Sequence, residues 1–114
     1  MQIKGAYMSV IELTKDNFDK EVVESDKVVL IDFWASWCMP CKMLSPVVDQ
    51  VAEEYPQIKV CKVNVDKEGE LASAFNVSSI PMLVVVKDKQ VVDTSVGVVP
   101  KEKILQMLSI VDKM

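Results

Sequence analysis

The sequence predicts an α/β fold: a central, mostly parallel sheet with one antiparallel edge hairpin and helices on both faces. Segments rich in β-branched residues alternate with segments whose apolar residues recur at helical spacing, which is typical of parallel strands connected by helices. Near the end of the chain, two β-branched runs lie close enough in sequence to form a hairpin. The length of 114 residues, 50% of them apolar, suffices for one hydrophobic core.

In the first half of the chain, two strands alternate with two helices. Residues 10–13 favour a short strand, and residues 14–23 a helix with its threonine as N-cap. Residues 28–34 are almost continuously apolar, as in a strand that is covered on both faces. Apolar residues then recur at helical spacing over 38–55, and Pro46 inside this run predicts a kink rather than two helices.

The second half supplies the remaining elements. Residues 58–65 favour a third strand and residues 70–75 a short helix. Residues 82–86 and 91–96 are the two arms of the hairpin, whose turn contains no glycine. Pro100 suits the first turn of a last helix. The apolar stripe of that helix consists of Ile104, Leu105, Leu108 and Val111.

Composition and charge exclude several classes of protein. The net charge is −4, which is unfavourable for non-specific binding to nucleic acid. No apolar run is long enough to span a membrane, and the N-terminus has no secretory signal, so we expect a cytoplasmic protein. The complete absence of histidine excludes Cys-His pairs, histidine-containing triads and histidine zinc sites. We expect residues 9–114 to form the domain, with residues 1–8 as a leader outside it.

Two of the three cysteines, Cys38 and Cys41, lie three residues apart where a strand ends and a helix begins. Residues at this spacing in a helix have Cβ atoms about 5–6 Å apart, and a disulfide needs about 3.5–4.5 Å, so a small adjustment lets the pair bond. The open helix end favours a thiolate at Cys38, whereas Cys41, one turn inside, should be shielded. These positions predict that Cys38 attacks a target disulfide and that Cys41 resolves the mixed disulfide.

Other interpretations of the pair are half of a zinc site, a structural disulfide, or two ordinary core residues. Cys61, the third cysteine, follows twenty residues later, and four zinc ligands are hard to assemble from these thiols. A disulfide that closes so short a loop constrains the unfolded chain little. Cys61 itself is expected to be a buried, inert residue, with a regulatory thiol as the alternative.

Asp32 is an acid within an otherwise apolar strand, where burial should raise its pKa. The functional interpretation makes Asp32 the proton acceptor for Cys41. If the second and third strands are neighbours, Lys62 could lie near Asp32, and the alternative is a structural Asp32–Lys62 pair. Ile80-Pro81 precedes a strand, and its peptide bond is either cis or that of an ordinary strand opener.

The segment from Phe33 to Lys42 (FWASWCMPCK) closely resembles the active site of the thioredoxin family. The similarity runs from about Val10 to Val111, which identifies a thioredoxin-like fold. It includes further residues in family order and at family-like spacing, namely Asp32, Pro46, Lys62, Ile80, Pro81 and Gly97.

The resemblance implies a protein-disulfide reductase that needs no cofactor beyond its own Cys38–Cys41 disulfide. Its partners would be disulfide-containing target proteins and a flavin-containing thioredoxin reductase or a similar electron donor, and we expect a monomer. Pro81 would be cis and would face the thiols. The residues expected to border the groove for an extended target segment are Trp37, Met39, Pro40, Ile80, Pro81, Val96 and Gly97.

The sequence departs from the family at two positions. Met39 replaces the usual glycine between the cysteines, from which we expect a somewhat weaker reductant, and the last hairpin turn lacks its glycine. Because of Met39, a thiol oxidase or isomerase on the same fold is the alternative enzyme. A non-catalytic peptide-binding module is the alternative outside the enzymes.

Overall fold

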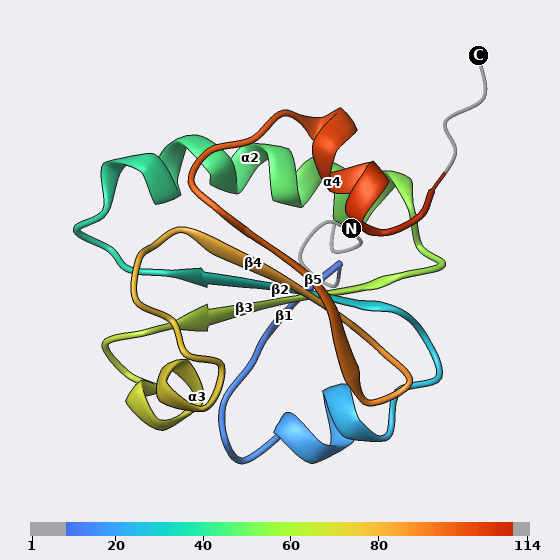
Figure 1. The fold of residues 1–114 in the computed structure, drawn as a ribbon, viewed down its shortest axis with the longest axis horizontal. Helices are drawn as coiled ribbons and strands as arrows, with labels where there is room; N and C mark the ends of the chain where they lie inside the picture. The colour runs from blue at the N-terminus through green and yellow to red at the C-terminus, as the bar shows by residue number, and fades with distance from the viewer. Residues whose placement is uncertain (1–8, 111–114) are drawn as a thin grey trace, which may run out of the picture.

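The computed structural model describes residues 9–110, which form five strands and four helical segments (Figure 1). The elements in chain order are β1 (Val10–Glu12), η1 (Asp19–Val23), β2 (Val29–Trp34), α2 (Met39–Glu54), β3 (Lys59–Asn64), α3 (Gly69–Ala74), β4 (Met82–Lys87), β5 (Gln90–Val96) and α4 (Lys101–Met107). Among residues 9–110, none of the helices has the length and apolar character that crossing a membrane requires.

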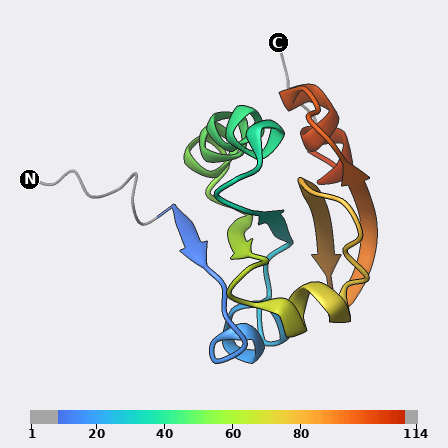
Figure 2. The ribbon, with the colours of Figure 1, turned by 90° about the vertical axis from the view of Figure 1, so that its left-hand side faces the viewer.

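The five strands form one sheet in the order β1-β3-β2-β4-β5. β1, β3 and β2 are parallel to one another, whereas β4 is antiparallel to β2 and β5 is antiparallel to β4. β1 and β5 therefore form the two edges (Figure 2). The predicted α/β class is confirmed, and β2 becomes the central strand with a neighbour on each side.

Helices cover both faces of this sheet, as the alternation of strands and helices predicts. α2 and α4 pack on one face, where Leu30 of β2 joins a core with Leu44 and Ile104. η1 and α3 lie on the other face, where Phe33 joins Leu71. Since successive residues of a strand point to opposite faces, Asp32 lies on the α2 side together with Leu30.

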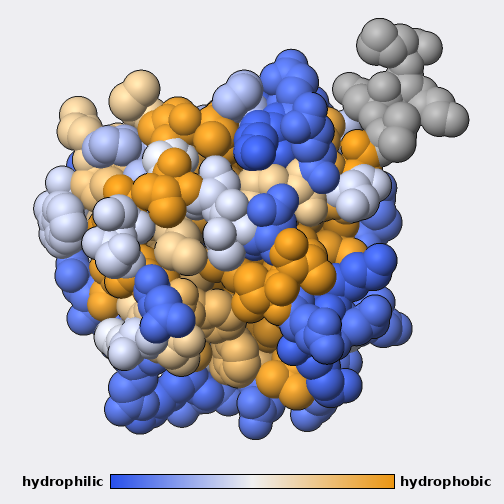
Figure 3. All heavy atoms as spheres, in the orientation of Figure 1, coloured by the Kyte–Doolittle hydropathy of each residue, from blue (hydrophilic) through white to orange (hydrophobic). Residues whose placement is uncertain are grey.

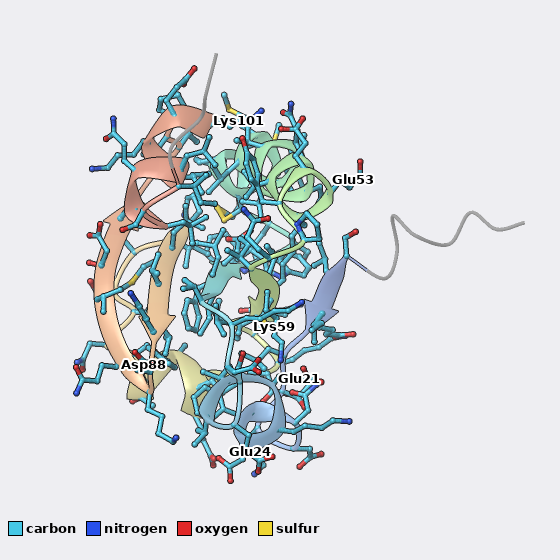
Figure 4. All side chains as sticks on the ribbon, turned by 90° about the vertical axis from the view of Figure 1, so that its right-hand side faces the viewer. Glu21, Glu24, Glu53, Lys59, Asp88 and Lys101 are labelled. Atoms are coloured by element: carbon cyan, nitrogen blue, oxygen red, sulfur yellow. A yellow bond between two sulfur atoms is a disulfide. The ribbon has the colours of Figure 1, made fainter. Side chains whose placement is uncertain are left out.

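The predicted helix over residues 14–23 is wrong at its start. Asn17 accepts a hydrogen bond from the Thr14 backbone N–H (2.8 Å) and donates one to the Glu12 carbonyl (3.0 Å). These bonds hold a turn in place of the first helical turn, because a short polar side chain competes with the helix for backbone groups. What remains is the five-residue π-helix η1, and the Lys59 ammonium holds it by bonding the Glu21 carbonyl (2.9 Å) and carboxylate (3.1 Å) (Figure 4).

The other elements match their predicted positions to within a few residues. α2 runs as one helix through Pro46, as predicted, and the kink expected at Pro46 stays a prediction. α4 ends at Met107, and its stripe residues Ile104, Leu105 and Leu108 are buried. Val111, predicted to extend that stripe, lies outside the described residues, as does the predicted leader over residues 1–8.

The β4–β5 turn consists of Asp88 and Lys89, which have φ angles of 52° and 67°. Positive φ at both central residues is the signature of a type I′ turn, whose twist suits a two-residue hairpin. Residues with a Cβ atom adopt this conformation at a cost of roughly 1–2 kcal/mol each. The predicted hairpin thus closes with a two-residue turn, whose type the sequence left open, without the glycine that would relieve this cost.

Lys89→Gly is expected to raise the free energy of unfolding by roughly 0.5–1 kcal/mol, because the relief of the left-handed backbone exceeds the added entropy of the unfolded chain. Urea denaturation of the oxidised protein measures the change. Lys87→Gly is the matched control at the end of β4, where glycine should lower stability instead. A decrease for Lys89→Gly would contradict the prediction.

Candidate active site

The first turn of α2 holds the two cysteines at the carboxyl end of β2. Cys38 is the N-cap of α2 with an extended backbone, and its N–H donates to the Ala35 carbonyl (3.2 Å). Its sulfur accepts a hydrogen bond from the Cys41 N–H (3.2 Å). The two residues form a disulfide, with their Cα atoms 5.3 Å apart. The sequence-based expectation that this pair can bond across the first helical turn is met.

Both cysteines are buried when they are bonded. Cys38 is 5% exposed and Cys41 is 3% exposed, and they form a small buried cluster with Ala35, against which Trp34 and Ile80 pack. Cys41 is shielded, as expected, but Cys38 is nearly as enclosed. Burial therefore does not distinguish the two sulfurs, and the predicted difference in their reactivity rests on their positions: Cys38 is the N-cap of α2 and Cys41 lies within its first turn.

Asp32 is buried to 2% exposure on β2, and its Oδ1 has no hydrogen-bond partner. A cavity of about 250 Å³ connects it to Cys41, and Lys42, Ser45 and Lys62 also line this cavity. Loss of solvation raises the pKa of Asp32 from 3.8 to about 6; the charge of Lys62 opposes this shift and that of Asp49 adds to it. The structure thus places an acid that can change protonation near neutral pH at the base of the Cys38–Cys41 site.

Lys62 is the register partner of Asp32 on the adjacent strand β3. Its ammonium lies 2.8 Å from Asp49 Oδ1 and 2.7 Å from Ser45 Oγ, both on α2. Within the part of the chain that the structure describes, Lys62 forms no salt bridge with Asp32. The alternative of a structural Asp32–Lys62 pair is therefore not observed. Sequence reasoning missed Ser45 and Asp49, although their spacing from Cys41 along α2, four residues at each step, places all three on one side of the helix.

The loop before β4 faces the disulfide from the other side. The Ile80–Pro81 peptide bond is cis, and Ile80 packs against the cluster of Ala35 and the two cysteines. The Pro81 carbonyl accepts a hydrogen bond from the Gly97 N–H (2.8 Å), and Gly97 has a φ angle of 96°, which favours glycine. Val96 pairs with Met82 on β4 and is exposed. Of these residues, Ile80 packs against the cysteine cluster, while Val96 and Gly97 are joined to the same loop through Met82 and the Pro81 carbonyl; their place in a target groove stays a prediction.

Trp37, Met39 and Pro40 form the outer rim of the site. Trp37 and Met39 are each 68% exposed, and Pro40 is exposed as well. The Trp37 indole donates to Asp66 Oδ2 (2.9 Å), a partner that sequence reasoning did not identify. Trp37 and Ile80 also line a pocket of about 190 Å³. An apolar surface thus surrounds the buried disulfide.

Cys61 lies apart from this site in the middle of β3, on the opposite face of the sheet. It is fully buried, and burial raises its pKa to about 12. A thiol in this state is a poor nucleophile, which supports the inert interpretation. Among the described residues, no group of three or more His, Cys, Asp or Glu side chains could hold a metal ion.

A disulfide on the first turn of a helix, beside a buried acid and mounted on a mixed sheet, defines the class of thiol–disulfide oxidoreductases. Comparison with known proteins gives the family. The thioredoxin family model matches residues 9–110. The chain is 47% identical to the thioredoxin of Porphyra purpurea over 103 residues, which are 90% of this chain and 96% of that protein.

Two further relatives support the same assignment. Identity is 50% to thioredoxin 1 of Synechococcus elongatus over 103 residues, or 89% of this chain and 96% of that protein. It is 44% to the thioredoxin of Chlorobaculum thiosulfatiphilum over 98 residues, or 85% of this chain and 91% of that protein. The chain belongs to the thioredoxin family, and the family together with the Cys38–Cys41 disulfide supports thiol–disulfide oxidoreductase activity.

Asp32→Ala is expected to abolish a pH-dependent loss of stability. Between pH 3.8 and about 6, the folded state holds a proton on Asp32 that the unfolded state has released. The free energy of unfolding therefore falls as the pH rises through this range, by about 2–3 kcal/mol, and the loss persists above it. The free energy of unfolding of Asp32→Ala, minus that of wild type, should therefore increase by about 2–3 kcal/mol as the pH rises from 4 to 7.

Urea denaturation of the oxidised proteins at several pH values measures the difference. Asp26→Ala removes an exposed aspartate and should leave the difference nearly constant. A constant offset for Asp32→Ala as well would show that Asp32 does not carry a raised pKa.

Proposed function

We propose that this protein reduces disulfide bonds of other proteins by dithiol–disulfide exchange through Cys38 and Cys41. The observation that carries the proposal is the Cys38–Cys41 disulfide at the N-cap of α2. Residues at this spacing in a first helical turn need only a small adjustment to bond or to open. Membership of the thioredoxin family supports reduction, rather than oxidation, of the target disulfide, because the relatives reported above are named thioredoxins.

In the first step, the Cys38 thiolate attacks one sulfur of a target disulfide. The target S–S bond breaks, a mixed disulfide forms on Cys38, and the second target sulfur leaves as a thiolate that takes up a proton. The N-terminus of α2 favours negative charge at Cys38, since the Cys41 N–H already points at the Cys38 sulfur (3.2 Å). This position is the reason for assigning the attack to Cys38.

In the second step, Cys41 gives up its proton and attacks the Cys38 sulfur. The mixed disulfide breaks, the Cys38–Cys41 disulfide forms, and the target leaves as a dithiol that carries the two electrons. Asp32 is the proton acceptor in this proposal, because the cavity joins it to Cys41 and its pKa of about 6 lies near neutral pH. The charge of Lys62 restrains that pKa from rising further.

The rim of the site suits an extended, partly apolar target segment. The exposed apolar side chains of the rim include Trp37, Met39 and Val96, and hydrophobic patches lie among hydrophilic residues on the face shown in Figure 3. The residues proposed to contact the target are Trp37, Met39, Pro40, Ile80, Pro81, Val96 and Gly97. A thioredoxin reductase, or a similar flavin-containing donor, would return the disulfide to the dithiol, and we propose that the protein acts in the cytoplasm as a monomer.

Cys41→Ser is expected to accumulate mixed disulfides between Cys38 and target proteins, because the attacking thiol remains and the resolving thiol is gone. Non-reducing gels and mass spectrometry of the trapped species measure this. Cys38→Ser should trap none, and equal trapping by both variants would contradict the assignment of roles. Reduction of insulin by dithiothreitol should be accelerated by the wild type and not by Cys38→Ser, whereas a peptide-binding module would accelerate it in neither form.

Met39→Gly is expected to lower the redox potential by about 10–40 mV, where 30 mV corresponds to about 1.4 kcal/mol. Met39 has two opposing effects. A side chain that narrows the backbone freedom of the open form favours the disulfide, whereas a thioether and methylene groups beside the sulfurs exclude water and strain the tight ring, which favours the open dithiol, and we expect the second effect to prevail. Equilibration of both proteins in glutathione buffers measures the potentials. An equal or higher potential for Met39→Gly would refute this account of Met39.

A further inference from the structure

The Lys62 side chain crosses from the sheet to α2 and is held there by two residues. Its ammonium contacts Asp49 Oδ1 at 2.8 Å and Ser45 Oγ at 2.7 Å. Ser45 and Asp49 are four residues apart, so they lie one turn from each other on the same side of α2. Two of the three ammonium hydrogens are therefore directed towards α2.

Asp32 would be the competing partner for this ammonium. The two residues face each other in the register of β2 and β3, and both line the same cavity of about 250 Å³. Asp32 Oδ1 nevertheless has no hydrogen-bond partner. In the described part of the chain, Lys62 is thus the register partner of Asp32, but its ammonium pairs with Asp49 and Ser45 instead.

The choice of partner matters because of where the two carboxylates lie. The Asp49 side chain is 52% exposed, so water already stabilises its charge. Asp32 is buried, so a cation in contact with it would act through a low dielectric and favour its charged form strongly. A contact in the core also requires the ammonium to lose its remaining water, and this cost offsets much of the attraction. The hydrogen bond and salt bridge on α2 can therefore compete with a contact to Asp32.

We propose that Ser45 and Asp49 are positioning residues that hold the Lys62 ammonium on α2, so that no cation contacts the buried carboxyl of Asp32. The proposal deepens the proposed function and rests on it, since it concerns the acceptor of the Cys41 proton. It makes the proton affinity of Asp32 depend on a hydrogen bond and a salt bridge made by residues four and eight positions beyond Cys41 on α2.

The charged and titratable groups around Asp32 come from few elements. β3 contributes Lys62, and β4 contributes the uncharged Leu83 as the register partner. α2 contributes Lys42 and Cys41 at the cavity and Asp49 beyond it. The charges of α4 begin with Lys101, which pairs with Glu54 at the far end of α2. Lys62 is the group among these whose distance from Asp32 depends on Ser45 and Asp49.

The pKa of Asp32 can be measured by carboxyl ¹³C NMR in the oxidised protein, where Cys38 and Cys41 are bonded and do not titrate. Asp49→Asn should lower it from about 6 towards 3.8, because the released ammonium can approach Asp32. Glu53→Gln is the matched control: it removes the same charge from the same helix at an exposed site that points away from the sheet (Figure 4) and should leave the pKa of Asp32 unchanged. An unchanged pKa in Asp49→Asn, or an equal shift in both variants, would overturn the proposal.

A double-mutant cycle with Lys62→Met separates positioning from direct repulsion between Asp49 and Asp32. If Asp49 acts by holding Lys62, most of the shift caused by Asp49→Asn should disappear in the Lys62→Met background. A shift of the same size in both backgrounds would show direct repulsion and would overturn the proposal.

Ser45→Ala tests the second contact without changing any charge. It should shift the pKa of Asp32 in the same direction as Asp49→Asn and by less, whereas Asp49→Glu keeps the charge and should leave the pKa near the wild-type value. An unchanged pKa in Ser45→Ala would remove Ser45 from the proposal.

The pH dependence of mixed-disulfide release connects the positioning of Lys62 to the proposed reaction. Its midpoint should move with the pKa of Asp32 in Asp49→Asn. A pKa that moves while the midpoint stays would support the positioning of Lys62 and reject Asp32 as the proton acceptor, so the two proposals can fail separately.

Discussion

The position of β2 at the centre of the sheet is the constraint on which the site depends. Neighbouring strands on each side fix its backbone, and helices cover both of its faces. Its register is therefore set by the core, and a shift by one residue would exchange Asp32 with the apolar Ile31 or Phe33. The same strand delivers the chain to the first turn of α2, so that the placement of the disulfide and of the buried acid follows from one strand.

The site combines two opposite electrostatic environments within a short distance. The helix N-terminus stabilises negative charge on Cys38, whereas the apolar interior destabilises it on Asp32. In the proposed reaction, the Cys38 thiolate forms at the N-terminus of α2, and Asp32 in the interior accepts the proton that Cys41 gives up. The acid has a high proton affinity because burial outweighs the attraction of a lysine whose ammonium is bound to α2.

Much of this arrangement could be predicted from the sequence, because strong signals coincide there. The apolar run of β2, the β-branched hairpin and the helical spacing of α2 each gave the right element, and the acid and the cysteine pair stood out against their surroundings. The errors arose where side chains compete with backbone: Asn17 displaced the first turn of the predicted helix. The partners of Lys62 were missed because spacing along one helix does not tell which of two carboxylates a flexible ammonium will choose.

The burial of Cys61 within β3 has a consequence for electron counting. Because that thiol lies on the far side of the sheet from the Cys38–Cys41 pair, no exchange among the three can occur while the strands stay paired. The folded protein is therefore a carrier with a single couple, which takes up or gives off electrons two at a time, and a mispaired isomer requires that the centre of the sheet first come apart.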